Sequence, residues 1–144
     1  MSQQAPSDEE LREILKSSQS IAIVGVSDKP DRPSYGVAEW LINNSHLEVY
    51  LVNPRVSELF GKTVYPSLSD LPITPDIVDV FRNIADAPAI LEESIAVKAK
   101  TLWFQLGLAD EAVAKQAVDA GLKSIQNRCS KIEYARLIGI YSKN

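Results

Sequence analysis

Short apolar segments with the residue preferences of β-strands alternate with amphipathic helical patterns along nearly the whole chain. Strands are expected over residues 20–26, 47–52, 62–65, 76–81, 100–104 and 122–125. Several of these runs are continuously apolar, as in parallel strands that are covered on both faces. Parallel strands need crossover connections, which the intervening helices supply. The sequence therefore predicts an α/β fold, a three-layer α/β/α Rossmann-like sandwich whose mainly parallel sheet has five or six strands, with residues 62–65 at its edge.

Helix boundaries are indicated by capping residues and breakers. A leading helix is expected over about residues 7–18, because Ser7 and Glu10 have the spacing of a capping box. Further helices are expected after residue 34, from near residue 86 or 88, over about residues 110–120 before Gly121, and from Ser130. Ser130 and Glu133 repeat the capping-box spacing.

Composition limits the kinds of partner. A chain of 144 residues, 45% hydrophobic and 24% charged, is expected to form one soluble domain, residues 1–144. Its net charge of -4 disfavours a general affinity for nucleic acid or an anionic membrane. Neither a membrane-length apolar run nor a secretory signal pattern is evident, so a cytoplasmic setting is expected. A single cysteine and a single histidine predict neither an intramolecular disulfide nor a metal site.

A ligand of such a sheet binds beyond the carboxyl ends of the strands, at the switch point of the topology. The second expected strand ends in Asn53-Pro54-Arg55. Dinucleotide-binding folds usually carry there an acid that accepts a hydrogen bond from the ribose. A basic residue instead indicates a nucleotide with a phosphate on its ribose, which places coenzyme A or NADP ahead of NAD.

The loop after the first strand lacks the G-x-G-x-x-G fingerprint, because Ser27 and Pro30 stand where the second and third glycines would be. It brings Ser27, Arg32 and Ser34 to the start of the next helix, where a pyrophosphate could be held by backbone N–H groups. The alternative is that Ser34 is only an N-cap and Arg32 only a solvated loop residue.

Other candidates each have a structural and a functional interpretation. Arg82 follows a buried strand and is expected to enter the crevice, unless an acid such as Asp79 neutralises it. Cys129 precedes a helix start and is either a reactive thiol or a small buried residue. His46 is expected at the opposite end of the sheet in a structural role, whereas Trp103 and Phe104 are expected to pack in or over the sheet, with Trp103 able to flank a ligand.

Six sequence blocks, read in order, resemble one known family. They are IAIVGVS from Ile21, RPSYGV from Arg32, VNPR from Val52, DIVDVFR from Asp76, WFQLG from Trp103 and NRCSKIE from Asn127. With these blocks the chain resembles the small coenzyme A-binding proteins, which are related to the nucleotide-binding domain of the succinyl-CoA synthetase alpha subunit.

The resemblance implies a Rossmann-type domain that holds coenzyme A or an acyl-CoA. By motif position it implies a pyrophosphate side formed by Gly25, Val26, Ser27, Arg32, Ser34 and Tyr35. It further implies that Asn53, Pro54 and Arg55 meet the ribose phosphate and adenine, and that Phe81 and Arg82 close the site.

The related ligases phosphorylate a histidine of a second domain, and this sequence contains neither that domain nor a suitably placed histidine. A non-catalytic binding protein is therefore expected. Three alternatives remain: an NADP-dependent reductase, a protein whose Cys129 forms a mixed disulfide with the coenzyme thiol, and a subunit that binds a partner enzyme domain.

Overall fold

A seven-stranded sheet organises the computed structural model, which describes residues 5–141. The strands are β1 (Ser20–Val24), β2 (Glu48–Val52), β3 (Glu58–Leu59), β4 (Lys62–Tyr65), β5 (Ile77–Val80), β6 (Thr101–Phe104) and β7 (Lys123–Ile125). Their order in the sheet is β3-β4-β2-β1-β5-β6-β7. All neighbouring pairs are parallel except β3 with β4. The predicted parallel α/β architecture is thus confirmed.

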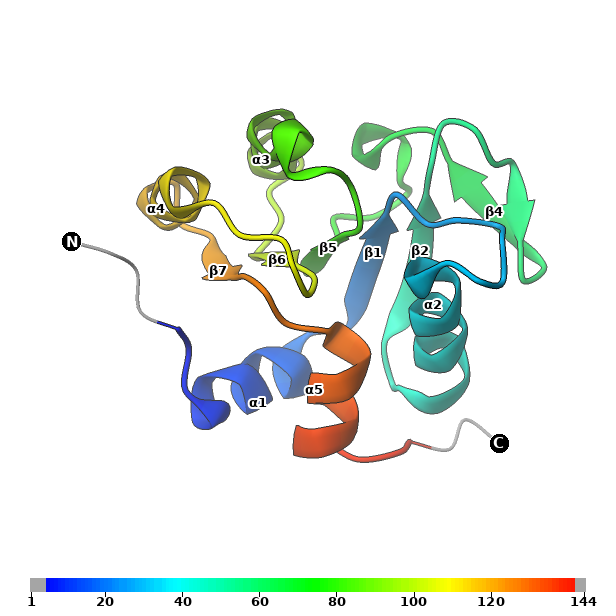
Figure 1. Cartoon of the computed structure of the whole chain (residues 1–144), viewed down its shortest axis with the longest axis horizontal. Coiled ribbons are helices and arrows are strands. Elements are labelled where there is room, and N and C mark those ends of the chain that lie inside the picture. Colours follow the sequence, from blue (N-terminus) through cyan, green and yellow to red (C-terminus); the bar gives the residue numbers. More distant parts are fainter. Residues whose placement is uncertain (1–4, 142–144) are drawn as a thin grey trace.

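Five α-helices cover the two faces of this sheet. They are α1 (Asp8–Ser17), α2 (Pro33–Asn44), α3 (Ala87–Ala96), α4 (Glu111–Asp119) and α5 (Ser130–Leu137). Figure 1 shows α3 and α4 on one face and α1, α2 and α5 on the other. Each layer closes its own apolar core against the sheet. The three-layer sandwich follows from strands that are apolar on both sides.

The edge of the sheet differs from the expectation. The predicted edge strand, β4, is the second strand from that edge, because the short antiparallel strand β3 pairs with it outside. The sheet therefore has seven strands and not five or six. Two residues of strand, one of them exposed, carry too little apolar periodicity to be recognised.

The two predicted capping boxes have different outcomes. Ser7 caps α1, since its Oγ accepts a hydrogen bond from Glu10 N at 3.1 Å. Ser130 does not cap α5, because Cys129 holds the N-cap position and Ser130 is the first helical residue. Its hydroxyl donates to Asp79 instead. The Ser130 hydroxyl therefore bonds to the buried carboxyl group of Asp79 in β5 and does not cap the helix.

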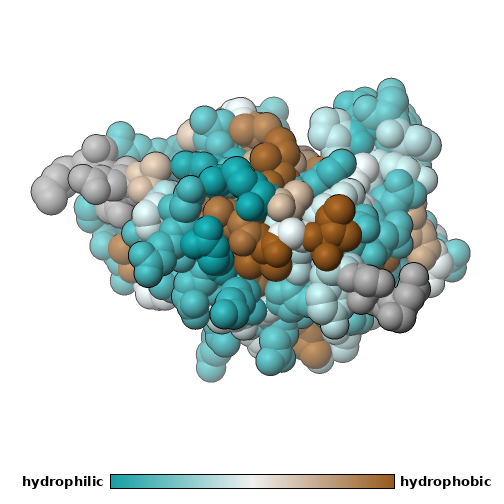
Figure 2. All heavy atoms as spheres, turned by 90° about the horizontal axis from the view of Figure 1, so that it is seen from below, coloured by the Kyte–Doolittle hydropathy of each residue, from teal (hydrophilic) through white to brown (hydrophobic). Residues whose placement is uncertain are grey.

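The outer surfaces of α1, α2 and α5 are mostly hydrophilic. Figure 2 views this face and shows separate small apolar areas within a polar surface. Ile132 of α5, with 52% of its surface exposed, is among the large apolar side chains that remain in contact with solvent. These helices are therefore amphipathic: their apolar faces pack on the sheet and their polar faces meet solvent.

His46 lies between α2 and β2, at the end of the sheet opposite the strand carboxyl ends. Its ring joins two elements, with Nε2 2.8 Å from the Ser18 carbonyl oxygen and Nδ1 2.6 Å from the Tyr134 hydroxyl. The same hydroxyl accepts a hydrogen bond from His46 N at 3.0 Å, and Tyr134 is fully buried. His46 thus anchors the core side of α5.

Replacing Tyr134 by phenylalanine is expected to lower the free energy of unfolding by about 1–3 kcal/mol. The change leaves the partly buried His46 N–H without the acceptor that the buried Tyr134 hydroxyl supplies, and an unsatisfied donor inside a protein has a cost of that order. Urea unfolding measures the effect, and Tyr65→Phe, at a half-buried tyrosine of β4, is the control. Equal stability of Tyr134→Phe and wild type would contradict this role of the hydroxyl.

Candidate functional site

A cavity of about 910 Å³ opens at the carboxyl ends of the parallel strands. This volume is within the range of roughly 300–1,000 Å³ typical of ligand pockets. Loops after β1, β2, β5, β6 and β7 all contribute to its wall. It therefore lies where the topology predicts a ligand, beside β1, whose two neighbours are reached by connections on opposite sides.

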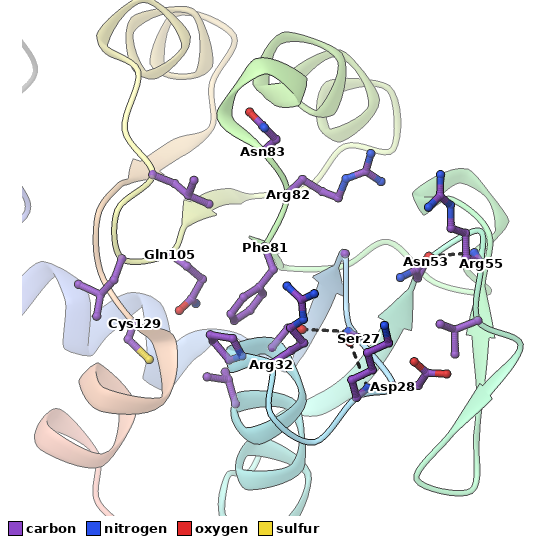
Figure 3. Close-up of a pocket in the computed structure, with 18 residues that line it drawn as sticks. Ser27, Asp28, Arg32, Asn53, Arg55, Phe81, Arg82, Asn83, Gln105 and Cys129 are labelled. Carbon is purple, nitrogen blue, oxygen red and sulfur yellow. Dashed lines mark hydrogen bonds between the residues drawn. The ribbon is translucent and has the colours of Figure 1, made fainter.

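Most of the residues predicted from the sequence line this one cavity, and Figure 3 shows several of them converging on it. The lining includes Gly25, Ser27, Arg32, Ser34, Asn53, Arg55, Phe81 and Arg82. Three predicted residues do not line it. Val26 is fully buried in the core, the Tyr35 ring packs on Phe60 with centroids 4.7 Å apart, and Pro54 borders a second cavity of about 210 Å³.

The turn after β1 requires glycine. Gly25 has φ +88°, and a Cβ atom there would lie 2.8 Å from Cδ of Arg82. The absence of a side chain allows the Arg82 chain to cross over the end of β1. The backbone of Gly25 and the side chain of Arg82 therefore lie against each other and together form part of the cavity wall.

Ser34 holds the β1–α2 loop and is not the N-cap of α2. Its Oγ accepts a hydrogen bond from Ser27 N at 2.9 Å, and the residue is buried. Arg32 occupies the N-cap position without a side-chain cap, and the first turn of α2 contains no acidic residue. The positive end of the helix is thus neither capped nor neutralised by its own side chains, which suits an anionic group.

Asn53 connects the loops that follow β1 and β2. Its Nδ2 donates to the Val26 carbonyl oxygen at 2.7 Å, and its Oδ1 accepts from Arg55 N at 2.8 Å. Neither Arg32 nor Arg55 forms an ion pair with any residue that the structure describes. Two guanidinium groups at this rim therefore keep their donors for a ligand.

Arg82 is paired, but with Asp86 and not with Asp79. Its Nη2 lies 3.0 Å from Asp86 Oδ2, and both side chains are 42% exposed. The suggestion that Asp79 neutralises Arg82 is wrong, because Asp79 is fully buried within the sheet. The exposed pair contributes little to stability and leaves Arg82 at the rim of the cavity.

The buried carboxyl group of Asp79 lies behind the opposite end of the cavity. It accepts hydrogen bonds from Gln105 Nε2 at 2.5 Å and from Ser130 Oγ at 2.6 Å. Gln105 Nε2 also donates to Ser130 Oγ at 2.9 Å. Burial raises the pKa of Asp79 to about 7, although the two hydrogen bonds act in the opposite direction.

Three lining residues at this end were not among the predicted site residues: Gln105, Leu106 and Leu108. Their loop follows β6, so its position at a strand carboxyl end indicates it. Cys129, the candidate reactive thiol, also lines the cavity. Cys129 is half-buried at the start of α5. The neighbouring Arg128 guanidinium is bonded to Glu133 at 3.1 Å. Trp103 does not flank the cavity, since it is fully buried and donates to the Arg128 carbonyl oxygen at 2.8 Å.

Residues 5–141 contain no group of three or more histidine, cysteine, aspartate or glutamate side chains placed to hold a metal ion. No helix among them is both long and apolar enough to cross a membrane.

Comparisons with known proteins identify the family and the fold of this chain. The CoA binding domain family matches residues 19–135. The uncharacterized protein YneT of Bacillus subtilis is 36% identical over 132 residues, which is 92% of this chain and 97% of YneT. A hypothetical protein from Pyrococcus horikoshii has a similar solved structure, with a TM-score of 0.87 at 37% identity over 96% of this chain and all of that chain.

A larger enzyme shares the fold. The dinucleotide forming acetyl-coenzyme A synthetase 1 of Ca. Korarchaeum cryptofilum superposes with a TM-score of 0.68 at 21% identity, over 79% of this chain and 26% of that chain. At that identity the similarity concerns the architecture alone. The family match covers most of the chain and all of the strands and cavity loops described above. The chain belongs to the CoA binding domain family.

Proposed function

We propose that this protein binds coenzyme A in the cavity at the strand carboxyl ends and acts as a binding protein without catalysing a reaction itself. One observation carries the proposal: Arg32, Arg55 and Arg82, from three separate loops, line the same cavity as the uncapped start of α2. Coenzyme A carries a pyrophosphate and a 3′-phosphate, and guanidinium groups bind such groups in bidentate fashion.

Each part of the nucleotide has residues suited to it. The pyrophosphate would lie at the start of α2, against Gly25, Ser27 and Arg32. The 3′-phosphate would bind Arg55, whose backbone is fixed by Asn53. Phe81 and Arg82 would cover the ligand from the β5 side. The remaining length of the coenzyme, ending in its thiol, would extend toward Gln105 and Cys129.

The proposal of binding without catalysis rests on the side chains that line the cavity. Cys129 is the one nucleophilic thiol among the described residues, and the lining residues include no histidine to serve as its base. His46 is engaged at the other end of the sheet. Such a cavity suits a protein that holds or presents the coenzyme.

A thermal-shift titration tests the proposal. Coenzyme A at a hundred times its dissociation constant is expected to stabilise the fold by about 2.7 kcal/mol, seen as a raised melting temperature. NADPH, which also carries a phosphate on its adenosine ribose, is the control and is expected to have a much smaller effect. An unchanged melting temperature with millimolar coenzyme A, together with a rise in NADPH, would contradict the assignment.

Replacing Asp86 by alanine is expected to tighten coenzyme A binding about two- to fivefold. In the free protein Asp86 holds the Arg82 guanidinium, and an exposed pair of this kind is worth less than about 1 kcal/mol. Its removal frees Arg82 and takes a negative charge away from the proposed phosphate site. Calorimetry measures the change.

The matched control is Asp119→Ala, which breaks the equivalent exposed pair with Lys115 on α4, where neither residue lines the cavity. This variant should bind coenzyme A like wild type. Weaker binding by Asp86→Ala would mean that the ion pair holds Arg82 in its binding position and does not compete with the ligand.

A further inference from the structure

The two ends of the cavity differ in character. Figure 3 shows Arg55 and Arg82 at one end, Gln105 and Cys129 at the other, and Arg32 with Phe81 between them. The Gln105 end is completed by the apolar side chains of Leu106 and Leu108. The cavity therefore has a cationic end for phosphates and an apolar end with a single amide.

The orientation of that amide is fixed from behind. Nε2 of Gln105 donates a hydrogen bond to Asp79 Oδ1, so the nitrogen side of the amide meets the carboxyl group. Both amide hydrogens are used, one by Asp79 and one by Ser130. Gln105 is 5% exposed, and its Oε1 accepts no hydrogen bond from the described residues. The cavity wall thus presents an acceptor, not a donor.

The charge of Asp79 has no cation beside it. Its strand neighbours at the same register are Ile23 and Trp103, and it forms no ion pair with any residue in the described range 5–141. The helices on this side of the sheet and the loops leading to them carry these titratable groups: Asp8, Glu9, Glu10, Arg12, Glu13, Lys16, Asp28, Lys29, Asp31, Arg32, Tyr35, Glu39, Arg128, Cys129, Lys131, Glu133, Tyr134 and Arg136. None of them bonds to Asp79, and only burial, Gln105 and Ser130 act on its pKa.

Two other amide side chains, those of Asn53 and Asn83, line the cavity, and neither lies at this end. The Asn53 amide is bonded within the loops after β1 and β2. The Asn83 Oδ1 accepts from Ala85 N at 3.0 Å, in the turn that leads into α3. Figure 3 shows this side chain pointing away from Gln105 and Cys129. A group that enters the Gln105 end therefore meets apolar atoms, a thiol and one carbonyl oxygen backed by a carboxyl group.

We propose that the Gln105 end of the cavity selects the acyl state of the coenzyme by charge: it accepts a free thiol or an apolar acyl group and rejects an acyl group that ends in a carboxylate. A thiol or amide N–H of the ligand can donate to Gln105 Oε1, whereas a carboxylate can only accept. A second carboxylate near Asp79 is also repelled, and more strongly in a poorly solvated pocket than in water. Asp79 is a positioning residue here: it does not line the cavity, but it orients the Gln105 amide and its charge acts from behind that amide. This inference rests on the proposed binding of coenzyme A.

Butyryl-CoA and succinyl-CoA form the matched pair of probes. Their acyl groups have the same chain length and differ in ending with a methyl or with a carboxylate. Isothermal titration of wild-type protein near pH 8 is expected to give a dissociation constant for succinyl-CoA about tenfold above that of butyryl-CoA. Asp79→Asn is expected to reduce the ratio to about threefold or less, because it removes the charge and keeps the shape.

The pH dependence separates charge from shape. Asp79 with a pKa of about 7 is mostly neutral near pH 6 and ionised near pH 8.5. The ratio of the two dissociation constants should therefore rise with pH in wild type and stay flat in Asp79→Asn. Protonation of the coenzyme phosphates affects both probes equally and cancels in the ratio.

A second variant tests the same charge effect without changing a buried residue. Leu106 lines this end of the cavity and is 61% exposed, so it can be replaced without disturbing the sheet. Leu106→Arg adds a cation and is expected to bring succinyl-CoA to at least the affinity of butyryl-CoA. Val118→Arg, at an exposed residue of α4 that does not line the cavity, adds the same charge elsewhere and should leave the wild-type preference for butyryl-CoA.

The outcomes distinguish this inference from the proposed function. Binding of coenzyme A with equal affinities for the two acyl forms in wild type, or an unchanged ratio in Leu106→Arg, would overturn the charge selection and leave coenzyme A binding intact. Failure of wild type to bind coenzyme A and 3′-phospho-ADP, the nucleotide half alone, would overturn the proposed function and the selection with it.

Discussion

Replacing Arg55 by glutamate is expected to weaken coenzyme A binding about a hundredfold while weakening dephospho-coenzyme A only a few-fold. A charge-assisted hydrogen bond to phosphate is worth about 1.5–3 kcal/mol, and the new carboxylate adds repulsion. Dephospho-coenzyme A lacks the 3′-phosphate and should not sense this change strongly. Calorimetric titration of both ligands measures the difference.

Arg12→Glu, at an exposed arginine of α1 that does not line the cavity, controls for the overall change in charge. Its affinity for both ligands should match wild type. Equal losses for both ligands in Arg55→Glu would remove the assigned 3′-phosphate contact, even if coenzyme A still bound elsewhere in the cavity.

Replacing Asp79 by asparagine is expected to change how stability depends on pH. The pKa of Asp79 is raised in the folded protein from 3.8 to about 7. Between these values the unfolded chain has lost this proton and the folded protein keeps it, so the free energy of unfolding falls as pH rises. The fall is about 1.4 kcal/mol per pH unit, or about 4 kcal/mol in all, and it levels off above the folded-state pKa.

Asparagine does not titrate, so the variant lacks this fall. The difference in unfolding free energy between Asp79→Asn and wild type should therefore move in favour of the variant by about 4 kcal/mol from pH 4 to pH 8. Urea unfolding across this range measures it, with Asp119→Asn, at an exposed carboxylate of α4, as the control. A difference that does not change with pH would mean that Asp79 is ionised equally readily in both states.

The strands and helices were largely predictable because the chain is locally consistent. The apolar runs that became β1, β5 and β6 are fully buried, as their continuous hydrophobic pattern indicates. Their observed ends lie within two residues of the predicted ones. The strand that was missed, β3, depends on a tertiary partner, because its two residues are ordered by pairing with β4.

The site was predictable where position in the topology decides it. Arg55 and Arg82 follow strands directly, so the rule that ligands bind at strand carboxyl ends places them together. The face of the sheet to which the Asp79 side chain points was not predictable from the sequence pattern. In a strand buried on both faces, alternation does not distinguish one side from the other, and only the register with Ile23 and Trp103 shows which layer a side chain enters.

The two serines at helix starts differ from the capping pattern because their hydroxyls bond to other groups. Ser34 and Ser130 both stand at helix starts and carry the residue type of an N-cap. Each hydroxyl instead bonds to a group distant in sequence or across the loop, Ser27 N for one and Asp79 for the other. Capping rules describe an isolated helix, whereas here the helix starts form the wall of a cavity.

A crystal structure of the protein with coenzyme A shows directly whether the nucleotide lies in this cavity. We expect the 3′-phosphate in hydrogen-bond contact with the Arg55 guanidinium, the pyrophosphate at the start of α2 beside Arg32, and the thiol near Gln105. Coenzyme A bound with its phosphates away from all three cavity arginines, or outside the cavity altogether, would contradict this placement.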